Sequence, residues 1–295
     1  MIWIAGAVCL DIVAMRTRFI DGTSNPSSFR LGVGGVGYNI FRSCTAPARF
    51  ITALGRDPIS GIAREALRGN PAVLIRDFEE GQPAVYAAFM EDGRLKVGAS
   101  DLSALENGLD AAFLLEAIGE PNDGDFLVLD GNLSARAIRG AVERLAARVR
   151  IVFEPVSVEK SLRHRASLKG CWLATPSEKE SAALVRGEDA RGPLPEESGR
   201  GGVPGITDDE VFAWMHEAGP ENLLVTRGER GTSLYAGGAR RDFPPGRVVR
   251  TSDSTGAGDL LVASLLGFLH QGLGLREAIT PAMAVVESAL GKGKT

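Results

Sequence analysis

The sequence is poor in the residue types that bind nucleic acid, form disulfides or hold zinc. Aromatic residues make up only 6% of its 295 residues, and 33 basic against 37 acidic residues leave a net charge of −4 without a basic stripe. Nucleic acid is therefore not an expected partner. The three cysteines are odd in number and far apart, which argues against a disulfide framework and favours a reducing compartment. The three histidines are scattered and predict no zinc cluster.

Long hydrophobic runs are also missing. The longest apolar stretch, residues 260–269, is bounded by Asp259 and His270. It is well short of the roughly 20 residues that span a bilayer. The N-terminal residues 1–6 carry no basic leader, so we interpret them as a buried strand and not as a signal peptide. We expect a cytoplasmic protein that does not bind a membrane.

What the chain does contain is enough apolar material for a sizeable core. With 44% hydrophobic and 24% charged residues, it is neither disordered nor collagen-like. A chain of this length forms one large domain or two ordinary ones, and we expect one domain with an appendage. Short β-rich runs alternate with amphipathic windows such as 134–148, which predicts an α/β fold with a parallel sheet. The runs cover residues 2–10, 49–54, 73–75, 126–129, 150–153 and 223–226.

Two segments interrupt this alternation. Residues 21–31 are polar, and residues 82–99 contain two strand-like runs on either side of a Glu91-Asp92-Gly93-Arg94 turn. Asp-Gly between such runs is a strong hairpin signal. We expect the hairpin to project from the main sheet and to pair with residues near 12–20. The pattern allows either a lid over a cleft or an ordinary edge hairpin.

The region after residue 186 combines a loop signal with a helix signal. Residues 186–206 are rich in Gly, Pro, Glu and Arg and show no periodicity, which predicts a surface loop. Thr207 and Glu210 then have the spacing of a capping box. We expect a helix from there through His216.

The sharpest chemical signal is a glycine-rich loop, residues 253–259, that runs directly into an apolar helical stretch. Small residues let successive backbone N–H groups converge on one point, and the helix dipole adds positive potential there. The loop therefore predicts an anion site, most simply for phosphate. Asp259 would lie in the first helical turn, where its carboxylate can take a proton from a hydroxyl nucleophile. It could equally be an acidic residue that merely favours a helix N-terminus.

A second glycine cluster covers residues 32–39 and has two interpretations. Its G-x-G-x-x-G spacing, with Asp57 about twenty residues on, is typical of a dinucleotide fingerprint and keeps an oxidoreductase as a distant alternative. That fingerprint should follow the first buried strand directly, and a polar excursion intervenes here. In the other interpretation, Gly35 allows close approach of a polyol whose hydroxyls bind Asn39. Asp11, at the carboxyl end of the first strand, could accept from the same ligand.

Taken together, residues 34–39 and 253–259 resemble the two signatures of the pfkB, or ribokinase-like, kinase family. Residues 55–61 and 226–231 match two further motifs of the family, which lie between the two signatures and occur in the same order. The resemblance covers nearly the whole chain. It implies a single domain over residues 1–295 with a mostly parallel central sheet flanked by helices. It also implies a small β lid formed by segments of about 12–31 and 82–100. The activity implied is transfer of the ATP γ-phosphoryl group to a hydroxymethyl group of a sugar or nucleoside.

Within that family, four stretches are similar to the pseudouridine kinases: residues 24–26, 34–37, 130–134 and 154–157. Residues 98–102 also resemble their lid-return segment. This similarity predicts phosphorylation of the 5′-hydroxyl of a nucleoside, with pseudouridine first. Kinases for ribose, fructose or adenosine remain alternatives. A catalytically weak ligand sensor on the same fold is a more distant one.

The resemblance also implies roles for individual residues. It makes Asp259 the catalytic base and places the anion hole at Gly256, Ala257 and Gly258. It assigns the ribose hydroxyls to Asp11, Gly35 and Asn39, and the nucleotide side to Thr226, Gly228 and Gly231. Asn132 and Lys160 lie near the cleft by resemblance only.

The implied cofactors and partners follow from the same family. ATP is the expected phosphoryl donor, with Mg²⁺ near Glu180 through water and a possible K⁺ near residues 252–253. Many relatives have Asn-x-x-Glu where this chain has Ser177-Glu178-Lys179-Glu180, so we expect an altered response to metal and not a loss of activity. The substrate would be a small molecule. Apolar Val85, Ala87 and Phe89 on the lid would allow a homodimer.

Overall fold

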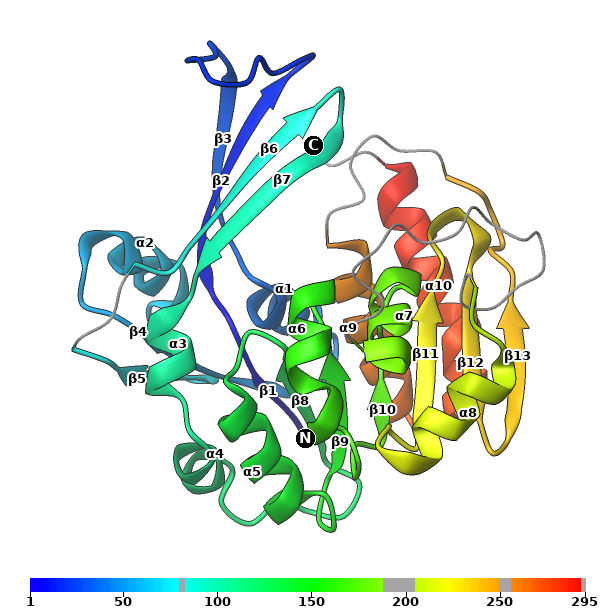
Figure 1. Cartoon of the computed structure of the whole chain (residues 1–295). Helices are drawn as coiled ribbons and strands as arrows, with labels where there is room; N and C mark the ends of the chain where they lie inside the picture. The colour runs from blue at the N-terminus through cyan, green and yellow to red at the C-terminus, as the bar shows by residue number, and fades with distance from the viewer. Residues whose placement is uncertain (80–82, 188–204, 250–255, 293–295) are drawn as a thin grey trace.

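The computed structural model describes residues 1–79, 83–187, 205–249 and 256–292. These residues form two β-sheets of different size, and helices cover the larger one (Figure 1). The large sheet has the strand order β13-β12-β11-β10-β9-β8-β1-β4-β5. Seven neighbouring strands, from β11 to β5, are parallel, and β12 and β13 add an antiparallel edge. The predicted mixed α/β fold with a mostly parallel sheet is confirmed.

Six strands of the large sheet fall on the predicted apolar runs, while β10, β12 and β13 were not predicted. The strands at the sheet centre are buried on both faces. Phe126–Asp130, for example, is buried along its whole length, which suits a strand covered by helices on both sides. The bounds are β1 (Ile2–Ala5), β4 (Ala48–Leu54), β5 (Val73–Asp77), β8 (Phe126–Asp130), β9 (Arg150–Glu154), β10 (Leu173–Ala174), β11 (Asn222–Thr226), β12 (Thr232–Ala236) and β13 (Ala239–Phe243).

Helices lie on both faces of this sheet. Helices α1, α9 and α10 form one layer, and α4 to α8 form the other (Figure 1). Among the described residues, no helix has both the length and the apolar character needed to cross a membrane. The bounds are α1 (Val36–Ser43), α2 (Pro58–Leu67), α3 (Ser103–Gly108), α4 (Ala111–Ile118), α5 (Ala135–Leu145), α6 (Val158–His164), α7 (Glu178–Arg186), α8 (Asp208–Glu217), α9 (Ala257–His270) and α10 (Leu275–Gly291).

Local sequence signals explain where several helices begin. Ser134 caps α5 by accepting a hydrogen bond from Ala137 N. The buried residues of this amphipathic helix are Ala137, Ile138, Ala141, Val142 and Leu145. The predicted capping box opens α8, since Thr207 accepts from Glu210 N and the Glu210 side chain accepts from Thr207 N. Most of the predicted loop 186–206 lies outside the described residues.

The small sheet consists of β2 (Cys9–Arg16), β3 (Ser28–Gly34), β6 (Val85–Glu91) and β7 (Arg94–Asp101), in the order β3-β2-β6-β7. The predicted hairpin is present as β6 and β7. Asp92 and Gly93 both have positive φ, 48° and 76°, as a tight hairpin turn requires. The predicted partner segment is also confirmed for residues 12–16, which pair in parallel with β6.

The prediction was wrong at one place near this sheet. Residues 2–10 are not one strand, because β1 ends at Ala5 in the large sheet and β2 begins at Cys9 in the small one. The segment 21–31, which the alternation alone left without a strand and the resemblance placed in the β lid, contains the start of β3 at Ser28. In this exposed edge strand Phe29, Leu31 and Val33 alternate with Ser28, Arg30 and Gly32.

Candidate active site

The N-terminus of α9 carries the predicted base. Gly256 is the N-cap with φ 77°, a left-handed conformation that favours glycine, and Leu260 N closes the first turn onto Gly256 O. Asp259 is the third residue of the helix and only 9% exposed. Residues 253–255 of the predicted anion loop lie outside the described residues. The described part of the loop therefore supplies a helix N-terminus with one nearly buried carboxylate beside it.

Asn39 on α1 contacts this carboxylate directly. The Asn39 Nδ2 group donates to Asp259 Oδ2 at 2.8 Å, between residues 220 positions apart. The two predicted sites, one for phosphate and one for hydroxyls, thus meet at a single hydrogen bond. The sequence interpretation missed this contact, because it assigned the whole Asn39 amide to a ligand. The hydrogen bond orients the carboxylate and leaves the Asn39 carbonyl oxygen as an acceptor.

The glycine cluster before α1 is required by close packing. A side chain at Gly34 would place its Cβ 2.0 Å from Asp11 Oδ2, and one at Gly35 would lie 2.5 Å from the Ala7 carbonyl oxygen. Gly35 also has φ 107°. Gly37 packs equally closely on the backbone of Gly6. The cluster follows β3 of the small sheet and not the first strand of the large one, so the dinucleotide interpretation has no structural counterpart here.

Asp11 lies beside this cluster near the start of β2. Its Oδ1 accepts a hydrogen bond from the Cys9 thiol at 3.4 Å. Burial raises the pKa of Asp11, while the Cys9 thiol and the positive charges of Arg30 and Arg42 oppose that rise. Burial and the neighbouring carboxylate raise the pKa of Cys9, so the thiol stays protonated. The predicted hydroxyl-binding residues Asp11, Gly35 and Asn39 therefore come from one short strand-to-helix region.

A pocket of about 350 Å³ lies on the other side of the α9 N-terminus, against α10. The predicted nucleotide-side residues Thr226, Gly228 and Gly231 line it together with Ala257 and Gly258. Two motifs that are far apart in the sequence thus share one pocket, named here the α10 pocket. Its apolar wall is formed by Leu261, Met283, Val286 and Leu290.

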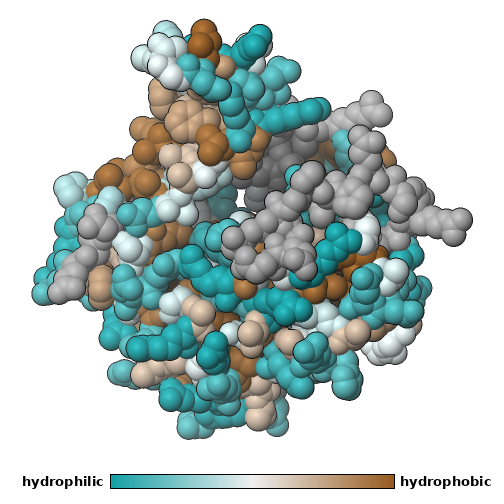
Figure 2. Space-filling view, viewed as in Figure 1, coloured by the Kyte–Doolittle hydropathy of each residue, from teal (hydrophilic) through white to brown (hydrophobic). Residues whose placement is uncertain are grey.

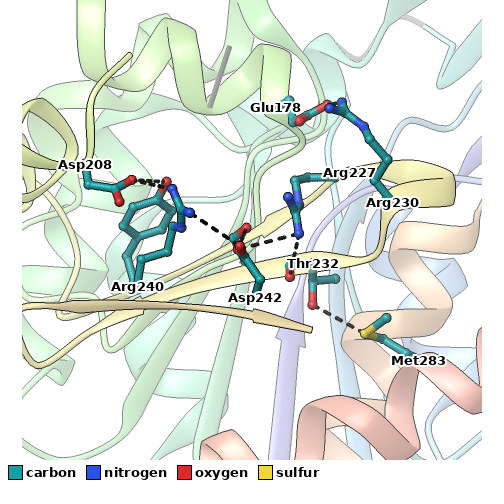
Figure 3. A network of polar contacts seen from close by, with 10 residues as sticks. Glu178, Asp208, Arg227, Arg230, Thr232, Arg240, Asp242 and Met283 are labelled. Atoms are coloured by element: carbon teal, nitrogen blue, oxygen red, sulfur yellow. Dashed lines mark hydrogen bonds and ion pairs between the residues drawn. The ribbon is translucent and has the colours of Figure 1, made fainter. Parts of the chain in front are cut away.

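The loop that follows β11 lines the α10 pocket, and charged contacts hold this loop in place (Figure 3). Arg227 is nearly buried, pairs with Asp242 at 3.5 Å and donates to the Thr232 carbonyl oxygen at 3.3 Å. Arg230 pairs with Glu178 in the first turn of α7. Thr232 Oγ1 contacts Met283 Sδ of α10 at 3.4 Å. The loop is therefore tied to β13, α7 and α10 at once.

The side chain of Glu180, the predicted metal residue, forms part of the N-terminal cap of α7. Its Oε2 accepts from Ser177 N at 2.7 Å, and the Ser177 side chain caps α7 in return. A buried carboxyl that the sequence interpretation did not assign, Glu154, lies within electrostatic range of both Glu180 and Asp259. Burial first, and then the charge of Glu180, raise the pKa of Glu154 well above its usual range. Its position at the carboxyl end of β9 was the available signal.

Among the described residues, no group of three His, Cys, Asp or Glu side chains is close enough to form a metal site on its own. Mg²⁺ usually keeps several waters and takes one or two carboxylates together with substrate phosphates. Glu180 and Glu154 fit that arrangement, since a cation would relieve the repulsion that raises the Glu154 pKa. Residues 252–253, the predicted K⁺ region, lie outside the described residues.

A second polar group, also unassigned by the sequence, supports the glycine cluster. The fully buried Asp130 accepts from Ala7 N and Gly37 N, each at 2.9 Å, and from Asn132 N at 2.7 Å. The Asn132 Oδ1 atom in turn accepts from Lys160 Nζ. The two residues placed near the cleft by resemblance thus form part of the floor that holds the start of α1.

Comparison with known proteins agrees with this geometry. The sequence profile of the pfkB family carbohydrate kinases matches residues 1–293. Pseudouridine kinase of Arabidopsis thaliana is 23% identical over 344 residues, covering 97% of this chain and 89% of that protein. The chain is also similar to solved structures, among them two ribokinases.

Ribokinase of Thermotoga maritima has a TM-score of 0.77 at 18% identity, with 99% of this chain and 93% of that chain covered. Arabidopsis thaliana ribokinase, complexed with ribose and ATP, has a TM-score of 0.73 at 16% identity, with 97% and 91% covered. These structural similarities show a shared fold. The match to the family profile spans almost the whole sequence, and the chain therefore belongs to the pfkB family of carbohydrate kinases, phosphotransferases whose acceptor is an alcohol.

Proposed function

We propose that the chain is an ATP-dependent kinase that phosphorylates the 5′-hydroxyl of a nucleoside, with pseudouridine as the first candidate. The observation that carries this proposal is the Asp259 carboxylate, which directly follows the pocket-lining residues Ala257 and Gly258 on α9 and accepts from Asn39 of α1. The resemblance to pseudouridine kinase of Arabidopsis thaliana, over 97% of this chain, supports the choice of acceptor.

In the proposed reaction, Asp259 orients the acceptor hydroxyl and receives its proton. The hydroxyl oxygen forms a bond to the γ-phosphorus, and the bond between that phosphorus and the oxygen bridging to ADP breaks. In a loose transition state the hydroxyl becomes acidic late, so an ionised carboxylate that orients it and takes the proton at the end suffices. The amides of Gly256, Ala257 and Gly258 stabilise the charge on the moving phosphoryl group.

ATP would occupy the α10 pocket. Thr226, Gly228 and Gly231 would lie beside the nucleotide, and the ATP-bound ribokinase with the same fold supports the choice of donor. Mg²⁺, when bound, would neutralise charge on the phosphates. Glu180 would hold it through water, and Glu154 is the second carboxyl near enough to contribute. A K⁺ ion near residues 252–253 remains part of the proposal on family grounds alone.

The direct test is ADP release with Mg-ATP over pseudouridine, uridine, adenosine, ribose and fructose. We expect the highest kcat/KM with pseudouridine. A higher kcat/KM with ribose, fructose or adenosine would keep the kinase and change its acceptor. Ligand-dependent stabilisation against melting without any ADP release would instead favour the sensor.

We further propose that the chain forms one kinase domain whose small sheet acts as a lid, and that two lids pair in a homodimer. One face of the small sheet is apolar and open, with Phe29 64%, Leu31 65% and Val97 54% exposed. Hydrophobic side chains gather over these strands in Figure 2. The proposed cytoplasmic location is supported by Cys9, Cys44 and Cys171, which are all free thiols.

A further inference from the structure

A second pocket, of about 690 Å³, lies on the small sheet. The strand register identifies its face. Asp11 pairs with Gly32 and Tyr86, and the next residue on the same face, Val13, pairs with Arg30 and Ala88. Directly paired residues project to the same side of a sheet. All of these residues line the pocket, which therefore lies on the face opposite to the exposed Phe29. Leu31 of β3 is also among the lining residues.

This pocket is continuous with the proposed hydroxyl site. Asp11 lies at its inner end, and Arg16 and Asp92 near the hairpin turn lie at its outer end. An acceptor held through its sugar hydroxyls at Asp11 would extend any substituent on the sugar outward along these strands. Free ribose has no such substituent, whereas a nucleoside carries a base. A volume of this size is within the range of small-molecule sites.

The chemistry of the lining suits a flat, polar ring. Arg30 presents a planar fork of N–H donors that matches carbonyl oxygens on the edge of a ring. Tyr86 is half-buried, and burial together with the charge of Asp11 raises its pKa, so the phenol stays neutral. Val13, Ala88 and Met90 supply apolar surface beside it. A uracil-type ring offers carbonyl edges to Arg30 and a flat face to Tyr86.

Gly98 on β7 keeps the Tyr86 ring in place. A Cβ atom at Gly98 would lie 2.7 Å from Tyr86 Oη and 3.0 Å from its Cε2 atom. Gly98 does not have a positive φ, so its backbone conformation is open to other residues. The absence of a side chain at Gly98 leaves space for the Tyr86 ring. The Tyr86 ring therefore lies over β7 at Gly98.

We propose that this pocket binds the base of the acceptor nucleoside, with Arg30 donating to base carbonyl oxygens and Tyr86 packing on the ring plane. The inference rests on the proposed function and adds the residues that would select a nucleoside with a carbonyl-bearing base over the free sugar. Asp11 and Asn39 hold the sugar, and the small sheet selects what is attached to it.

The test compares Arg30→Met with Arg94→Met. Arg94 lies on the same sheet, is exposed and does not line the pocket, so it is the matched control. ADP release and calorimetric binding are measured with pseudouridine, uridine and ribose. We expect Arg30→Met to raise KM and Kd for pseudouridine about tenfold or more, the effect of losing a charged hydrogen bond. The values for ribose should change less than about twofold, and Arg94→Met should leave all of them unchanged.

Gly98→Ala provides a second variant that leaves Arg30 intact. It should displace the Tyr86 ring and selectively weaken the binding of pseudouridine, with the fold checked by circular dichroism.

Equal losses of affinity for pseudouridine and ribose in both variants would overturn the base pocket, as would a wild-type enzyme that prefers ribose. If the wild type releases no ADP with any acceptor, the proposed function fails. Selective weakening of pseudouridine binding by Arg30→Met would still support the pocket, and absence of binding would overturn it.

Discussion

At the residue scale, the hydrogen bond between Asn39 and Asp259 fixes the orientation of the carboxylate and uses one donor of the amide. The carboxylate is held at the N-terminus of α9, where a helix dipole stabilises negative charge. The amide that holds it belongs to α1, the helix that follows the glycine cluster packed against Asp11. Substitutions at these two positions should therefore change the chemical step in different ways.

Asp259→Asn removes the proton acceptor and keeps a side-chain oxygen that can still accept from Asn39. We expect kcat to fall by about 10²–10⁴-fold, the usual contribution of a general base. Calorimetry should show nearly unchanged ATP binding, because the α10 pocket is lined by other side chains. Turnover within tenfold of the wild type would exclude Asp259 as the base.

Asn39→Asp tests the contact from the other side. The substitution places a second carboxylate at hydrogen-bond distance from Asp259, and two such groups cannot both ionise easily. The acidic limb of the pH profile of kcat should therefore move to higher pH by about one unit or more. Asn39→Leu, which removes the hydrogen bond without adding charge, is the control. An unmoved profile in Asn39→Asp would mean that Asp259 does not control that limb.

At the element scale, the start of α7 explains a departure from the family pattern. The Ser177 hydroxyl accepts from Glu180 N, and the Glu180 carboxylate accepts from Ser177 N. A serine performs this capping as well as an asparagine does. The replacement noted in the sequence therefore preserves the helix N-terminus that carries both Glu180 and Glu178, the partner of Arg230.

Two substitutions at Ser177 should separate capping from other effects. Ser177→Ala should lower the free energy of unfolding by about 1 kcal/mol, because the Glu180 N–H loses its acceptor. Ser177→Asn should remain within a few tenths of a kcal/mol of the wild type, since it restores an equally good cap. Urea unfolding of both variants gives the comparison. If the alanine and asparagine variants are equally stable, the cap does not contribute.

At the scale of the whole molecule, one buried histidine links stability to pH. His164 is fully buried, its Nε2 donates to Gly131 O at 3.0 Å, and its Nδ1 has no partner among the described residues. Burial lowers the pKa of His164 from 6.5 to about 4. The folded state therefore binds fewer protons than the unfolded state between these values. The stability contribution is complete above pH 6.5 and is lost as the pH falls toward 4.

The expected loss between pH 7 and pH 5 is about 2 kcal/mol in the free energy of unfolding. Asp130 and Glu154, whose pKa values are raised, change stability in the opposite direction. The measurement is therefore the difference between wild type and His164→Gln in urea unfolding at both pH values. The variant should lose less stability on acidification than the wild type. Parallel pH dependence in the two proteins would show that His164 is not responsible.

The proposed dimer makes a separate prediction for the whole molecule. Phe29 and Leu31 lie on the open apolar face, so the double change to serine should weaken self-association at least about tenfold. Ile62→Ser on α2, which is 46% exposed, alters a similar apolar side chain away from that face. Sedimentation velocity over a concentration series compares them. A wild-type chain that stays monomeric throughout would refute the lid dimer.

Local patterns in the sequence determined many of the elements and the family. The alternating apolar runs, the Asp92-Gly93 turn and the Thr207 cap act over a few residues, so their signals are complete in the sequence. Tertiary structure alone decided which distant groups meet. Four features depend on how the chain folds back on itself. They are the contact between Asn39 and Asp259, the burial of Glu154, the contact of Lys160 with Asn132, and the division of residues 2–16 between two sheets. Proximity across 220 positions leaves no local pattern, because it arises only from packing.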